Sequence, residues 1–173
     1  MLRIIYPQPG GPIAVITPVQ VEAQDGETAE EALLRHARGL LPEGTPVALV
    51  DADAIPADRT WRNAWSADFA SPYEERSQVT VDMDLAREIH RDRVRAARAP
   101  LLATLDADFM QALEAGDEGE KAQIAARKQM LRDAPATEAL AKATTPEALI
   151  ASIPDDELRE RYARFANVAK GGA

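Results

Sequence analysis

The side chains best suited to catalysis or metal binding are two histidines and a short run of aspartates. His36 and His90 lie far apart in the chain, and neither belongs to a metal-type spacing such as His-x-x-x-His. Asp51, Asp53 and Asp58 follow one another closely, but the glycine and closing glutamate of a calcium-binding loop are absent. We therefore interpret the histidines as surface residues and the aspartates as turn and cap residues.

Motifs for nucleophilic catalysis and phosphate binding are also missing from the sequence. The chain contains no cysteine, which excludes thiol catalysis, disulfides and cysteine metal ligands. The glycine-rich run at 9–12 joins two predicted strands, so it cannot present a helix N-terminus to a phosphate. Nucleophile elbows and dinucleotide fingerprints are absent. The sequence predicts a protein that is not an enzyme and that holds no metal or cofactor.

A row of arginines on one predicted helix is the best candidate for a basic recognition surface: Arg87, Arg91, Arg95 and Arg98. Three acidic residues are interleaved with this row: Asp84, Glu88 and Asp92. That spacing is typical of ordinary ion pairs on a solvated helix face. Aromatic residues for base stacking are missing, and the net charge of -9 repels a phosphate backbone. These features argue against nucleic-acid binding.

Composition limits the architecture of the chain. A length of 173 residues fits one domain or two small ones. The aromatic fraction is 5%, and abundant alanine adds little volume to a core. We expect a small globular part and an extended helical part, stabilised by a partner or by self-association. The sequence shows neither a signal peptide nor a run of about 20 apolar residues, so we expect a cytoplasmic protein outside the membrane.

The segment at 1–70 is predicted to form a small α+β domain. Apolar runs bounded by turn residues predict strands at 3–6, 13–16 and 47–50. Thr28 and Glu31 form a capping box, so a helix should follow to about Gly39. The first two strands should pair as a hairpin, because a dense turn signal separates them.

Two tryptophans stand near the end of this domain, and an extended connector follows at 71–82. Trp61 and Trp65 lie four residues apart in a short predicted helix at 59–65, so they should share one face. They either anchor the segment on the domain's core or form a docking site, because tryptophan is enriched in interface hot spots. We include both among the candidate partner-binding residues. In the connector, residues 78–81 alternate polar and apolar and predict an edge strand.

The segment at 83–135 is predicted to form a helical hairpin. On its first arm, apolar residues recur at three- and four-residue spacing: Leu85, Ile89, Leu101, Leu102, Leu105, Phe109 and Leu113. Pro100 lies inside this arm and predicts a kink or a break near Arg98. The second arm runs from Glu118 to Asp133 and has three residues on its apolar side: Ile124, Met130 and Leu131.

Four residues of the first arm are candidate partner-binding positions, since they would pack either on the hairpin itself or on a partner helix: Leu101, Leu105, Phe109 and Leu113. Beyond the hairpin, the segment at 136–173 predicts two shorter helices with proline-led starts at Pro146 and Pro154. The last helix has an apolar stripe and should end in a frayed tail at 170–173. The stripe consists of Leu158, Tyr162, Phe165 and Val168.

Two segments resemble proteins of tailed bacteriophages and prophages. The stretch 53–65, Asp-Ala-Ile-Pro-Ala-Asp-Arg-Thr-Trp-Arg-Asn-Ala-Trp, looks like the linker of small proteins encoded beside tail and tail-fibre genes. The stretch 84–133 is similar to the helical region of tail-assembly chaperone and tail-fibre-assembly families. It has an arginine-rich first helix, Ala-Pro-Leu-Leu at 99–102, and a second helix that ends in Lys-Gln-Met-Leu-Arg-Asp at 128–133.

This resemblance implies a non-enzymatic tail-associated protein that binds a tail or tail-fibre protein. It would act as a structural accessory subunit of the tail tip or fibre base, or as an assembly factor of the chaperone type. Its place would be the host cytoplasm during assembly and, for a structural subunit, the tail of the virion. The alternative is a free cytoplasmic adaptor or regulator that uses the helical hairpin as a peptide-binding groove.

Overall fold

The computed structural model describes residues 1–18, 21–70 and 76–168, with the side chains of 165–168 left out. It divides the chain into two compact units, Met1–Asp82 and Met83–Ala173. Strands gather in the first unit and long helices make up the second, so the predicted α+β class is confirmed. The predicted tail at 170–173 and the side chains of the predicted stripe residues Phe165 and Val168 lie outside what the structure describes.

The first unit is built on a three-stranded antiparallel sheet with strand order β2-β1-β3. Its central strand pairs with both neighbours, with Ile4 opposite Ile16 on one side and Leu49 on the other. Gly10 has a φ of 66° in the turn between the first two strands, a conformation that glycine adopts without strain. The strands are β1 (Leu2–Pro7), β2 (Ile13–Ile16) and β3 (Ala48–Asp51).

Both faces of this sheet are covered. One face packs against helix α1 (Ala29–Leu40), which begins at the predicted capping box of Thr28 and Glu31. Alternate residues of the strands point to the other face. There they meet the segment that follows the sheet in sequence, and the resulting core contains Ile5, Ile13, Ala48, Val50, Trp65 and Val79.

The segment that covers the second face contains short elements, and the short helix predicted at 59–65 is a 3-10 helix that ends at Ala64. Two 3-10 helices, η1 (Ala52–Ala54) and η2 (Arg59–Ala64), precede a two-stranded sheet of β4 (Trp65–Ser66) and β5 (Thr80–Val81). The predicted edge strand is therefore present, but it is two residues long and pairs with β4. This pairing makes the end of the predicted connector part of the first unit, which extends to Asp82.

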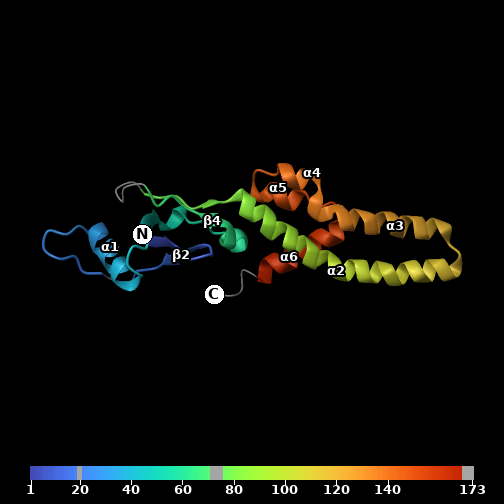
Figure 1. Cartoon of the computed structure of the whole chain (residues 1–173), viewed down its shortest axis with the longest axis horizontal. Coiled ribbons are helices and arrows are strands. Elements are labelled where there is room, and N and C mark those ends of the chain that lie inside the picture. Colours follow the sequence, from blue (N-terminus) through green and yellow to red (C-terminus); the bar gives the residue numbers. More distant parts are fainter. Residues whose placement is uncertain (19–20, 71–75, 169–173) are drawn as a thin grey trace. The chain divides into compact units, whose positions relative to one another are not determined.

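The second unit begins with the predicted helical hairpin (Figure 1). Helix α2 (Met83–Ala115) is one continuous helix of 33 residues, and α3 (Glu118–Asp133) returns beside it. Pro100 lies inside α2 without splitting it, because its exposed position leaves the displaced backbone groups open to water. Asp117 caps α3, and its side chain accepts a 2.9 Å hydrogen bond from the Glu120 amide.

Over the described residues 136–168, three α-helices follow the hairpin where the sequence predicted two. Thr137 caps the additional helix, because its hydroxyl accepts a hydrogen bond from the Leu140 amide at 3.3 Å. That short helix was not predicted, because no proline stands at its start. These elements are η3 (Ala134–Ala136), α4 (Glu138–Lys142), α5 (Pro146–Ala151) and α6 (Asp156–Val168).

Candidate functional site

The two tryptophans are buried in the first unit. Trp61 is 3% exposed and Trp65 is 4% exposed. They do not share a helix face, because the backbone at Trp61 departs from helical geometry and Trp65 begins strand β4. The docking interpretation needs exposed side chains, so the folded unit contradicts it. The anchoring interpretation fits, since Trp65 belongs to the core on the second face of the sheet.

The hairpin residues divide between core and surface. Leu101 and Leu105 are 4% and 6% exposed, and Phe109 packs half-buried against the same core. Leu113 is 47% exposed. The first three residues therefore pack within the unit, and only Leu113 is open to a partner. On α3, Met130 is also exposed, which corrects its predicted place on the buried side.

The buried side of α2 is rotated from the predicted one over its first turns. Leu85 is 39% exposed, whereas the buried positions there are Ala86, His90, Val94 and Ala97. These four positions repeat at the same three- and four-residue spacing and continue into Leu101. Three of these residues were not predicted to be buried, because two are alanines and one is a histidine.

The turn end of the hairpin carries exposed apolar side chains. Met110 is 53% exposed and Leu113 is 47% exposed, and their spacing of three positions places them side by side. Within the second unit, the α2–α3 turn lies away from α4, α5 and α6 (Figure 1). Further from the turn, Lys128 of α3 pairs with Asp106 at 2.5 Å and lies over the Phe109 ring at 5.0 Å.

The arginine row of α2 is largely occupied by its own unit. Arg98 donates from Nη1 to the carbonyl oxygens of Leu131, at 3.0 Å, and Arg132 at the end of α3. Arg95 pairs with Asp92 at 2.8 Å, as the interleaved acids predicted. An arginine that caps a helix C-terminus in this way complements the helix dipole, so this row is part of the fold rather than a free basic stripe.

Arg87 makes both kinds of contact, an ion pair and a hydrogen bond to backbone. It pairs with Asp84 at 2.5 Å and donates to the carbonyl oxygen of Ala143, which follows α4, at 3.4 Å. Two of the row's four arginines therefore join α2 to backbone that returns beside it.

His90 is buried, which corrects its predicted place on the surface. It is 0% exposed, and its Nδ1 shares a 2.9 Å hydrogen bond with the Tyr162 hydroxyl of α6. Burial, and then the charges of Arg93 and Arg91, lower the pKa of His90 to about 4. The imidazole is thus neutral near pH 7. We assign it to packing between α2 and α6.

Another charged cluster holds α3 to the start of α6. Arg127 pairs with Asp155 at 3.0 Å and with Glu157 at 2.9 Å. Asp155 also caps α6 by accepting a 2.8 Å hydrogen bond from the Leu158 amide. Burial acts to raise the pKa of Asp155, but the bond to Arg127 and the backbone amides outweigh it and hold this pKa below its usual range.

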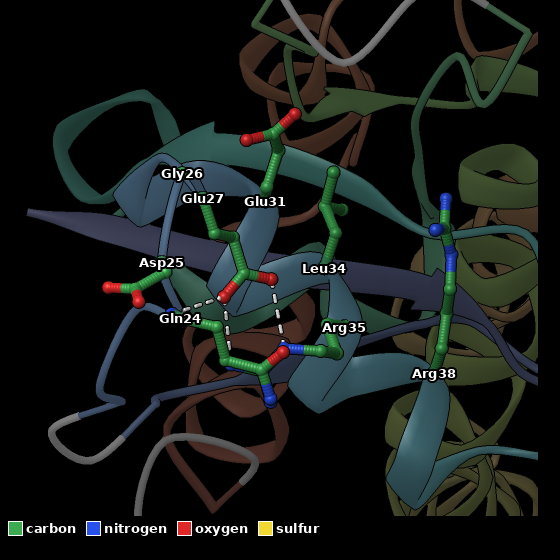
Figure 2. Close-up of a pocket in the computed structure, with 8 residues that line it drawn as sticks. All are labelled: Gln24, Asp25, Gly26, Glu27, Glu31, Leu34, Arg35 and Arg38. Carbon is green, nitrogen blue, oxygen red and sulfur yellow. Dashed lines mark hydrogen bonds and ion pairs between the residues drawn. The ribbon is translucent and has the colours of Figure 1, made fainter.

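A shallow hollow beside α1 in the first unit is lined by residues that bind one another (Figure 2). Arg35 and Glu27 form two hydrogen bonds, of 2.8 and 2.9 Å, and Arg35 also donates to the Glu22 carbonyl oxygen at 3.1 Å. The bond to Arg35 is the main reason that the pKa of Glu27 lies below its usual range. These contacts fasten the preceding loop to α1, and the lining charges of both signs offset one another.

The described residues offer no arrangement for metal or membrane chemistry. Residues 1–18, 21–70 and 76–168 contain no group of three His, Asp or Glu side chains placed to hold a metal ion. Over the same ranges, no helix is long and apolar enough to cross a membrane.

No known protein family, curated protein or solved structure matches this chain. A proposal of function therefore has three supports, namely the residues, the fold they adopt and the resemblance of residues 53–133.

Proposed function

We propose that this chain is a non-enzymatic protein associated with the tail of a tailed bacteriophage or prophage, where it binds a tail or tail-fibre protein. The resemblance of residues 53–133 to tail-assembly and tail-fibre-assembly proteins supports the link to tails. The helical hairpin of the second unit supports a binding role, because it presents an end that its own unit leaves uncovered.

The observation that carries the binding role is the pair Met110 and Leu113, with exposed fractions of 53% and 47%. Single exposed apolar residues are ordinary on protein surfaces. These two are neighbours on one helix face, beside the half-buried Phe109. Full burial of an exposed side chain of this kind contributes about 1.5–3 kcal/mol, so covering the exposed half of each contributes about 1 kcal/mol.

The same surface serves two versions of the proposal. As an assembly factor, the protein acts in the host cytoplasm and leaves its partner when the tail or fibre is complete. As an accessory subunit of the tail tip or fibre base, it stays in the virion. Self-association through the hairpin end is the alternative use of this surface.

Mass spectrometry of purified phage particles from a host that carries the gene tests the proposal. Stoichiometric recovery in virions supports a structural subunit. Absence from virions, with loss of tails or fibres when the gene is deleted, supports an assembly factor. Absence with normal tails after deletion contradicts the tail proposal and favours the cytoplasmic adaptor.

A pair of variants tests the surface itself. The double variant Met110→Asp with Leu113→Asp is expected to keep the wild-type melting temperature and to lose its place in particles or its support of assembly. Gln111→Asp adds a charge to the same helical turn and is the control, with normal incorporation expected. Normal incorporation of the double variant contradicts the hairpin end as the contact.

A further inference from the structure

A second hollow in the first unit, with a volume of about 350 Å³, is lined by three arginines. Arg3 comes from strand β1, while Arg59 and Arg62 come from η2. Trp65, Thr17 and Ile55 also line it. Among the described residues, no carboxylate lines this hollow, although the chain has 29 acidic against 20 basic residues. We name these residues the arginine-lined hollow.

Arg3 occupies a position where the fold calls for an apolar residue. It lies opposite Val50 in the β1–β3 pair and alternates with Ile4, so it shares the sheet face of Ile5 and Val50. Other members of that face pack in a core with Trp65. Because both faces of the sheet are covered, a strand residue on either face gains most from being apolar. A guanidinium at this place therefore needs a reason other than packing.

Two nitrogens of the hollow's residues are buried without a hydrogen-bond partner. They are Nη1 of Arg3 and the indole Nε1 of Trp65. Within the described part of the chain, no hydrogen bond or ion pair engages the side chain of Arg3, Arg59 or Arg62. Buried donors are nearly always satisfied in folded proteins, and unpaired ones destabilise the fold. Three like charges on one hollow add repulsion.

We propose that the arginine-lined hollow binds a phosphate-type dianion, either free phosphate or a small phosphate monoester. A dianion offsets the charge of the three arginines better than a single carboxylate does. Its several oxygens accept from guanidinium forks, from the indole N–H and from the Thr17 hydroxyl. Apolar lining such as Ile55 leaves room for a short organic group. The site lies within residues 1–82, so it does not rest on the proposed function.

A titration of the full chain with inorganic phosphate at constant ionic strength tests the proposal. The readout is the pair of indole N–H signals from the two tryptophans, with the Trp65 signal identified by its loss in Trp65→Phe. A saturable shift of the Trp65 signal, larger than that of Trp61, is expected at millimolar phosphate. Equal shifts in both signals, no shift, or the same response to chloride would overturn the proposal.

Variants separate binding from a structural role of the arginines. The double variant Arg59→Gln with Arg62→Gln should weaken phosphate binding at least tenfold, and without phosphate its melting temperature should equal or exceed the wild-type value. Arg38→Gln removes an exposed arginine of the same unit and should bind phosphate normally. Unchanged binding by the double variant overturns the proposal. A lower melting temperature without phosphate also overturns it, because the arginines would then be structural.

The source of the dianion is decided by a second titration with glycerol phosphate. Tighter binding than that of inorganic phosphate assigns the site to a phosphate monoester, and tighter binding of inorganic phosphate assigns it to the free ion. Both outcomes support the site. Binding of neither compound, with binding of an oligonucleotide that the double variant loses, overturns the small-ligand proposal in favour of a nucleic-acid contact.

Discussion

The first unit encloses its sheet on both faces, whereas the second unit buries only one side of its long helix. In the sheet, residues that alternate along β1 enter two different cores, as Ile4 and Ile5 do. In α2, a single line of residues is buried and the opposite side meets water. An arginine therefore has a different meaning in each unit. On α2, Arg87 and Arg98 bind backbone of their own unit, while Arg3 on β1 interrupts a covered face.

The arginines of α2 and those of the arginine-lined hollow also differ in their partners. Arg98 and Arg87 of α2 donate to backbone carbonyl oxygens or pair with acids of their own unit. The arginines of the hollow have no such partners in the described chain. Arginines that bind backbone or acids of their own unit hold elements together. Arginines whose side chains have no such partner are the better candidates for binding a ligand.

The largest effect is expected when a charge is placed on the buried side of α2. Leu105→Asp should destabilise the second unit by about 4 kcal/mol or more, because it removes core contacts and buries a carboxylate without a partner. Leu113→Asp, two turns further along, should change stability by less than about 0.5 kcal/mol, because that position is exposed. Thermal unfolding followed by circular dichroism measures both. Equal melting temperatures for the two variants would contradict the one-sided burial of α2.

A core deletion in the sheet tests whether the units differ in unfolding as they do in construction. Ile5→Ala should destabilise the first unit by about 3 kcal/mol. Both tryptophans lie in that unit, so their fluorescence should report an earlier transition, while the helical signal at 222 nm should move little. Leu131→Ala in the second unit should give the opposite pattern. Coincident shifts of both signals in both variants would show that the units unfold as one.

Protonation of His90 should make the stability of the second unit depend on pH. The pKa of His90 is lowered to about 4, below the ordinary value of 6.5, so the unfolded chain binds a proton first as the pH falls. Stability from this group is present above pH 6.5 and is lost between pH 6.5 and about 4, by about 3 kcal/mol in all.

The pH prediction is checked with His90→Asn, which offers Tyr162 a hydrogen-bond partner but does not titrate in this range. Its stability, measured by urea unfolding, should fall less between pH 6.5 and 4 than that of the wild type. His36→Asn, at a half-exposed position of the first unit, should keep the wild-type slope. A wild-type slope in His90→Asn would mean that His90 is not the group that titrates.

The smallest effect on stability is expected when single arginines of the α2 row are replaced. Arg98→Ala should destabilise the second unit by about 1 kcal/mol, because the carbonyl oxygens of Leu131 and Arg132 lose a charged donor. Arg91→Ala should change stability by less than about 0.5 kcal/mol. Urea unfolding at low salt resolves the two. Equal small effects would show that the helix-end contacts of Arg98 contribute nothing measurable.

Local signals in the sequence were enough to predict much of the secondary structure. The capping box at Thr28 and Glu31, the turn before Glu118 and the proline at 146 each mark a helix start through contacts made within a few residues. The three strands of the first sheet were also predicted, because apolar runs between turn residues indicate strands. The short helix at Glu138 was missed, because its Thr137 cap is followed neither by proline nor by a Glu or Gln three positions later.

Candidate-site residues were harder to predict, because exposure depends on what packs on each side chain. Trp61 and Trp65 suit an interface or a core equally well by residue type. Their burial follows from the segment that folds back over the sheet, and it could not be read from their spacing. Of the six candidate partner-binding residues, Leu113 is the one that the described structure leaves largely exposed.

By itself, the sequence determined the class of fold, the helical hairpin and its turn, because these depend on propensities and caps that act between near neighbours. Tertiary structure alone decided that His90 lies against Tyr162, which is 72 positions away, and that Arg3 joins Arg59 and Arg62 around one hollow. The physical reason is that burial and side-chain pairing depend on which residues are neighbours in three dimensions. Residues distant in the chain come together only when the sheet is covered and the helices are packed.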